Sequence, residues 1–118
     1  MDESDGMWLN QQRFADVDQL SIQLQANPKT AIDGALLKAR SLMIQKQYAE
    51  SRALIEQIIA RAPKNIWPRE LLAHCLLFEG RDLPSLAGAL RNVLALDATN
   101  QFALANLPAV EKKLAAAK

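Results

Sequence analysis

The chain has 118 residues, of which half are hydrophobic, and its 14 basic and 13 acidic residues leave a net charge of +1. This length suits one domain with a buried core, and the balanced charge provides no overall field to attract nucleic acid or an anionic membrane. The single cysteine, Cys75, excludes an internal disulfide, and no apolar run approaches the roughly 20 residues that cross a bilayer.

The N-terminal residues, MDESDG, are acidic and lack the apolar stretch of a signal peptide. Together with the lone cysteine, this favours a soluble protein of a reducing compartment, which we expect to be cytoplasmic. We predict that residues 1–14 form a flexible lead with a short helical turn near Met7 and Phe14. Residues 15–117 are predicted to form a single domain.

Hydrophobic periodicity predicts an all-α protein, because leucine and alanine recur at three- and four-residue steps while proline falls mostly between the periodic segments. Asp16 is the expected N-cap of the first clear helix, which ends before Pro28. Thr30 is the expected cap of the next. The predicted helices span residues 17–26, 31–46, 48–61, 66–79, 83–96 and 101–116.

The boundaries of the later helices are marked by polar caps. Asn65 and Asn100 are predicted to accept hydrogen bonds from the first turns of the helices that follow them. The predicted helix over residues 83–96 starts at Asp82 or Leu83. Pro108 lies inside the last helix and is expected to kink or split it.

The sequence repeats with a period of 34 to 35 residues. The turns over 27–30, 62–65 and 97–100 succeed one another at steps of 35 residues, and Leu20, Ile55 and Leu90 keep the same spacing. Recurrence at this length indicates a helical repeat protein, in which no single unit buries its apolar faces and neighbouring units must stack.

A helix–turn–helix unit of this length resembles the tetratricopeptide repeat (TPR). Ala39 and Ala73 match the small residue of the first helix in such a unit, and Pro63 follows the second helix. Lys46 stands where a turn glycine is usual, whereas Gly80 supplies one in the next unit. The resemblance implies a right-handed α-α superhelix, a TPR-like solenoid with about two full repeats and flanking helices.

By the same resemblance, partners bind on a concave face lined by the first helix of each pair. Helical spacing independently places Trp67, Glu70 and His74 on one face of a helix. Trp67 is the strongest anchor, because tryptophan is frequent in binding hot spots; the alternative is a tryptophan packed between adjacent turns. The candidate partner-binding residues are Asp33, Arg40, Met43, Trp67, Glu70, His74 and Phe78.

Catalytic and metal-binding roles find little support in the sequence. His74 and Cys75 are adjacent, so on a helix their side chains diverge by about 100° and do not form a nucleophile pair. The chain offers too few metal ligands on one face and no glycine loop for phosphates. We therefore expect no enzymatic activity, no cofactor, no metal, and neither nucleic acid nor a membrane as partner.

The leading hypothesis is a non-catalytic scaffold that binds a peptide or a partner domain on the concave face. In a second hypothesis, the apolar terminal segments dock on a neighbouring domain or form a homodimer through the terminal helices. In a third, the chain is the accessory TPR region of a larger bacterial enzyme of the glycosyltransferase or methyltransferase type. The reading frame around Met7 and Lys118 distinguishes the third hypothesis from the others.

Overall fold

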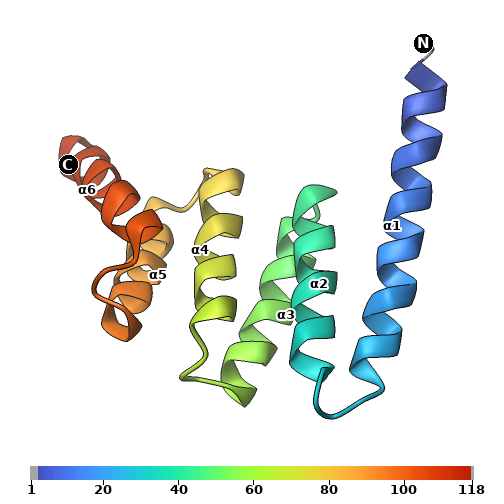
Figure 1. Cartoon of the computed structure of the whole chain (residues 1–118). Helices are drawn as coiled ribbons and strands as arrows, with labels where there is room; N and C mark the ends of the chain where they lie inside the picture. The colour runs from blue at the N-terminus through green and yellow to red at the C-terminus, as the bar shows by residue number, and fades with distance from the viewer. Residues whose placement is uncertain (1–2, 118) are drawn as a thin grey trace.

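The computed structural model describes residues 3–117 of the chain, with side chains from residue 13 onward. Within these residues the protein is all-α, with six helices and no strand (Figure 1). The helices are α1 (Glu3–Gln25), α2 (Ala31–Ile44), α3 (Tyr48–Arg61), α4 (Ile66–Glu79), α5 (Leu83–Leu96) and α6 (Gln101–Ala116).

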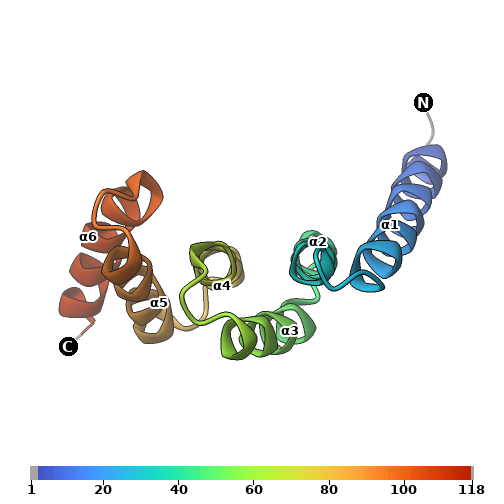
Figure 2. The same ribbon diagram turned by 60° about the horizontal axis from the view of Figure 1, so that its bottom comes forward.

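Each helix packs on its neighbours in sequence, and α2 also contacts α4. The result is a row of helices that measures 44 × 40 × 22 Å along its principal axes. Figure 2 shows the row bending, with α2 and α4 on its inner side and α3 and α5 on its outer side. No helix in the described part of the chain combines the length and apolar character that crossing a bilayer requires.

The first helix differs from its prediction. It begins at Glu3, so Asp16 lies inside α1 and is not an N-cap. Apart from Gly6, the segment before Asp16 contains no helix-breaking residue, and one glycine in a helix costs only about 1 kcal/mol. Residues 3–14 of the predicted flexible lead therefore belong to α1, whereas residues 1 and 2 lie outside the described residues.

Asn65 and Asn100 cap their helices as predicted, and Asp82, one of the two predicted starts of its helix, also acts as a cap. The side chains of Asn65, Asp82 and Asn100 accept hydrogen bonds from backbone N–H groups in the first turns of α4, α5 and α6. Thr30 precedes α2 without a side-chain cap; its hydroxyl instead donates a hydrogen bond of 2.6 Å to the Leu24 carbonyl, which ties the turn to the end of α1.

Pro108 does not split the last helix, because α6 runs without interruption from Gln101 to Ala116. Ala103 and Val110, on either side of the proline, are both buried in the same apolar cluster. Packing on both sides of Pro108 therefore holds the helix together despite the missing N–H group.

The core consists of two apolar clusters that meet at α4. Leu71 and Cys75 of α4 pack with residues of α2 and α3, and Ala73 and Leu76 of α4 pack with residues of α5 and α6. The half-buried Leu72 packs against both clusters. Because α4 contributes to each cluster, it couples the two halves of the row.

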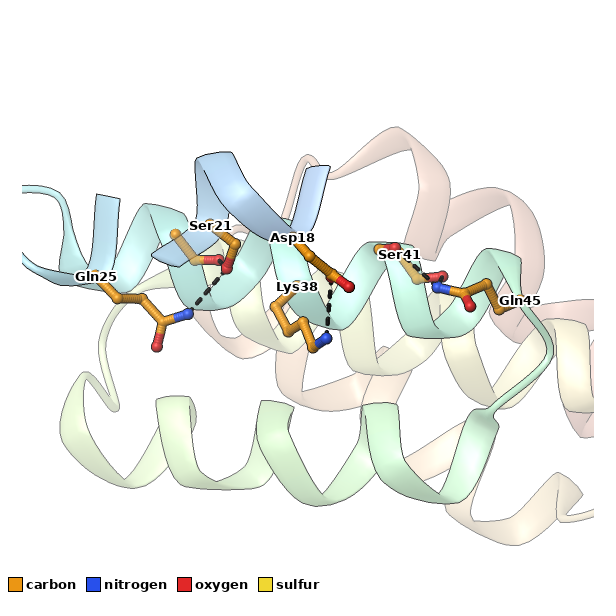
Figure 3. Close-up of polar contacts among 7 residues, drawn as sticks. Asp18, Ser21, Gln25, Lys38, Ser41 and Gln45 are labelled. Atoms are coloured by element: carbon orange, nitrogen blue, oxygen red, sulfur yellow. Dashed lines mark hydrogen bonds and ion pairs between the residues drawn. The ribbon is translucent and has the colours of Figure 1, made fainter. Parts of the chain in front are cut away.

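Polar groups and a glycine fix the contact between α1 and α2. The buried Ser21 hydroxyl donates a hydrogen bond of 2.7 Å to the Gly34 carbonyl, and Gln25 Nε2 donates one of 2.9 Å to Ser21 Oγ. Figure 3 shows the Gln25–Ser21 contact and an ion pair between Lys38 Nζ and Asp18 Oδ1, which lie 3.0 Å apart. At Gly34 an added Cβ would lie 2.8 Å from Leu24 Cβ and from the Ser21 carbonyl oxygen, so this approach requires glycine.

Candidate functional site

Three hollows meet on the face formed by α1, α2 and α4, and Arg40 of α2 lines all of them. The largest, of about 280 Å³, lies between α2 and α4 and is bounded by Asp33, Leu36, Leu37 and Trp67. A second hollow, of about 80 Å³, is lined in part by the polar residues Glu70 and His74 of α4. A third, also of about 80 Å³, lies against α1. We call this surface the α2–α4 face; its lining residues are Phe14, Val17, Asp33, Leu36, Leu37, Arg40, Ser41, Ile44, Trp67, Glu70, Leu71 and His74.

Trp67 is held at the edge of the α2–α4 face by the start of α4. Its backbone N–H donates a 3.0 Å hydrogen bond to Asn65 Oδ1, which caps the helix, and the next residue, Pro68, is buried. This capped first turn leaves Trp67 63% exposed beside the hollow of about 280 Å³. The alternative in which Trp67 packs between adjacent turns does not occur.

The middle of α4 carries a polar and aromatic cluster that reaches α6. His74 stacks on Phe102 with ring centroids 3.9 Å apart and an angle of 17° between the ring planes. Its Nε2 lies 3.9 Å from Glu70 Oε1, and Asn100 Nδ2 donates a hydrogen bond of 3.4 Å to Glu70 Oε2. Glu70 therefore has partners on its own helix and on the turn before α6.

The environment of His74 favours its neutral form. Partial burial lowers the pKa of His74 below its ordinary value, and the positive charge of Arg40 lowers it further, whereas Glu70 opposes both effects. Burial has the largest influence, so the imidazole is expected to be uncharged at neutral pH. Arg40 then supplies the positive charge at the centre of the α2–α4 face.

The structure brings most of the predicted partner-binding residues together. Asp33, Arg40, Trp67, Glu70 and His74 line two adjoining hollows.

Phe78 and Met43 behave differently from those five residues. Phe78 is 60% exposed and its ring lies 6.1 Å from that of His74, but it lines none of the hollows. Met43 is only 9% exposed and packs with Ala39 and Ile55, so it is a core residue and does not present its side chain to a partner.

Several residues of this face were missed by sequence reasoning. Ile44 is exposed and lines the hollow against α1, together with Phe14 and Val17 of α1. The 34-residue step places Ile44 in register with Phe78, which is a signal that could have identified it. For Phe14 and Val17 no such signal exists, because their role depends on how α1 lies against α2.

Cys75 points away from the α2–α4 face. It is fully buried, and its thiol Sγ lies 3.7 Å from the Tyr48 carbonyl oxygen of α3. Burial raises the pKa of the Cys75 thiol, which disfavours the reactive thiolate. His74 is stacked on α6 instead, so the two side chains do not converge into a catalytic pair.

A larger hollow lies elsewhere, between α3, α4 and α5, with a volume of about 640 Å³. Its floor includes small residues such as Ala53 and Gly88. Of its charged lining residues, Arg52 forms an ion pair with Glu79, and Asp82 accepts hydrogen bonds from Ser85. Its large apolar lining residues are the half-buried Leu72 and the buried Leu76. The α2–α4 face instead exposes Trp67 and Ile44, and we therefore consider it the better candidate site.

Among residues 3–117, no group of three or more histidine, cysteine, aspartate or glutamate residues is arranged to hold a metal ion. A scan of the chain against protein-family models finds no match, and a search of curated proteins finds none either.

Proposed function

We propose that this chain is a non-catalytic interaction module that binds a peptide or a partner domain on the α2–α4 face. The observation that carries the proposal is Trp67, which is 63% exposed at the rim of a hollow of about 280 Å³. A large aromatic side chain held rigidly beside an apolar recess is typical of a binding hot spot.

The same proposal includes a fold of the TPR type, a right-handed superhelix of about two repeats with flanking helices. Its support is the correspondence between two helix pairs, α2–α3 and α4–α5, in which all four helices have 14 residues. Ala39 and Ala73, which are 34 residues apart, are both fully buried. The contact between α2 and α4 agrees with first helices that line one face.

The energetic argument for binding rests on apolar exposure. Trp67 and Ile44 are each more than half exposed and line adjoining hollows, and exposed apolar side chains on one face mark interaction surfaces more often than isolated ones do. A partner that covered the indole of Trp67 would gain about 25 cal/mol for each Å² of apolar surface removed from water. The adjacent polar residues would fix its orientation.

Photo-crosslinking in the source cells tests this proposal. A photoreactive phenylalanine analogue placed at position 67 should crosslink to a discrete partner, because this side chain lies at the rim of the proposed site. The matched control carries the same analogue in place of Leu104, which is also exposed but lies on α6 and lines none of the three hollows.

The crosslink at position 67 should disappear when Arg40→Glu is added to the same chain. The crosslinked partner is then purified and tested for binding to the unmodified protein and to Trp67→Ala. Equal affinity for both proteins, or equal crosslinking from positions 67 and 104, would contradict the proposal.

A further inference from the structure

We propose that the α2–α4 face selects a protein segment in which an acidic side chain lies between two apolar side chains, with the acid placed against Arg40. This inference rests on the proposed function and adds the chemistry of the partner. It follows from the position of one charge between two apolar recesses.

Arg40 carries the positive charge on this face that is available to a partner. Its side chain is exposed, and among the described residues it forms no ion pair within 4.0 Å, although it lines all three hollows. Neighbouring Lys38, by contrast, is paired with Asp18. A guanidinium binds carboxylates in a planar, two-point geometry, so an acidic side chain is the natural complement of Arg40.

The two acidic residues of the face, Asp33 and Glu70, form no ion pair with Arg40 within 4.0 Å. Glu70 already interacts with His74 and accepts a hydrogen bond from Asn100. Asp33 lies in the first turn of α2, where the positive end of the helix dipole stabilises a carboxylate. A partner carboxylate near Arg40 would therefore meet an available cation in the centre of the site.

Apolar recesses flank Arg40 on both sides. Leu36 lies one turn before it, in the hollow beside Trp67, and Ile44 lies one turn after it, in the hollow against α1. Four residues of helix correspond to about 6 Å along the axis. A partner segment would fit both recesses if it carried one apolar side chain about 6 Å before the acidic residue and another about 6 Å after it. These positions are two residues from the acid in an extended segment and four residues from it in a helical segment.

A selection from random 12-residue peptides displayed on phage tests this inference. The protein should enrich peptides with aspartate or glutamate flanked by apolar residues at two- or four-residue steps. The Arg40→Glu variant should enrich lysine or arginine at the central position instead, because the sign of the site charge is reversed. A matched variant, Arg61→Glu, reverses an exposed arginine of α3 that lines none of the three hollows, and it should retain the acidic preference.

Synthetic versions of the enriched peptides are then titrated against each variant in solution, with circular dichroism as the control for folding. Arg40→Glu should weaken the acidic peptides at least about tenfold, whereas Arg61→Glu should change their affinity less than about twofold. The Arg40→Gln variant should lose the acidic preference without acquiring a basic one.

The outcomes separate this inference from the proposed function. The enriched peptides could bind the unmodified protein but not Trp67→Ala, and show no acidic preference. This result would overturn the inference about the acidic residue while still supporting the proposed binding site. If no enriched peptide depends on Trp67, the proposed function fails as well. An acidic preference that persists in Arg40→Glu would also overturn the inference.

Discussion

Lys46 and Gly80 both follow a helix in the left-handed backbone conformation, with φ angles of 64° and 68°. Around Lys46, the Gln47 N–H donates a hydrogen bond to the Leu42 carbonyl and the Lys46 N–H donates one to the Met43 carbonyl. These two bonds form a Schellman motif, which satisfies carbonyl groups at the end of α2. Gly80 N–H donates to the Leu76 carbonyl at the end of α4. This single bond is the simpler αL motif. Both helices thus end at a left-handed residue, which is lysine after α2 and glycine after α4.

Replacing Lys46 by glycine should stabilise the protein. A residue with a Cβ atom costs about 1–2 kcal/mol in the left-handed region, and the greater freedom of glycine in the unfolded chain offsets about half of this. We expect Lys46→Gly to raise the free energy of unfolding by about 0.5–1 kcal/mol in urea denaturation.

Gly80→Ala is the matched control and should act in the opposite direction, lowering the free energy of unfolding by about 1 kcal/mol. An added Cβ at this position meets no atom closer than 3.8 Å, so the backbone angle and not a collision is the cause. If Lys46→Gly destabilises the protein while Gly80→Ala has no effect, the backbone argument is wrong at both turns.

Alanine substitutions at two helical glycines should have opposite effects. Gly34→Ala places a methyl group 2.8 Å from Leu24 Cβ and from the Ser21 carbonyl oxygen, so α1 and α2 must separate. We expect a loss of about 1–3 kcal/mol in the free energy of unfolding. Gly88→Ala meets nothing within 4 Å, and the higher helix propensity of alanine should add about 0.5–1 kcal/mol. Equal effects of the two substitutions would show that helix propensity, and not packing, dominates at Gly34.

Truncation of Leu76 should weaken the whole row of helices. Leu76 is buried in the cluster that joins α4 to α5 and α6, and Leu→Ala in such a core costs about 2–5 kcal/mol. Because α4 also packs on α2 and α3, we expect a single transition at a lower midpoint. Unfolding is followed by circular dichroism and by tryptophan fluorescence. Separate transitions by the two probes would contradict a shared core.

Local sequence signals were sufficient for most of the helices. The span of α4 follows from the cap at Asn65 and the glycine at position 80, and the structure has the same boundaries. Such signals depend on groups within one turn of the chain. The helical face shared by Trp67, Glu70 and His74 likewise follows from spacing alone, and these residues line one hollow.

Features that depend on packing between helices could not be predicted in the same way. Leu20 keeps the 35-residue step to Ile55 and Leu90, which are fully buried, yet it is 48% exposed. The reason is that, among the described helices, α1 contacts α2 alone, so one side of α1 lacks a neighbour. Met43 shows the reverse case, since it was expected on the surface and packs in the core. The hollows around Arg40 arise only when α1, α2 and α4 are placed together.

His74 should make the stability of the protein depend on pH between neutral and mildly acidic conditions. Its pKa is lowered in the folded protein, chiefly by burial, from an ordinary value of 6.5. The unfolded chain therefore binds a proton more readily, and the stability associated with neutral His74 is fully present above pH 6.5 and is lost as the pH falls toward the depressed folded pKa. Asp82 and Asp97 have pKa values lowered from 3.8, so their contributions change only in more acidic solution. We expect the free energy of unfolding to fall between pH 7.5 and pH 5, and the fall to be smaller in His74→Gln, as measured by urea denaturation at each pH. Parallel pH profiles for the two proteins would contradict the assignment to His74, whatever the difference in their absolute stability.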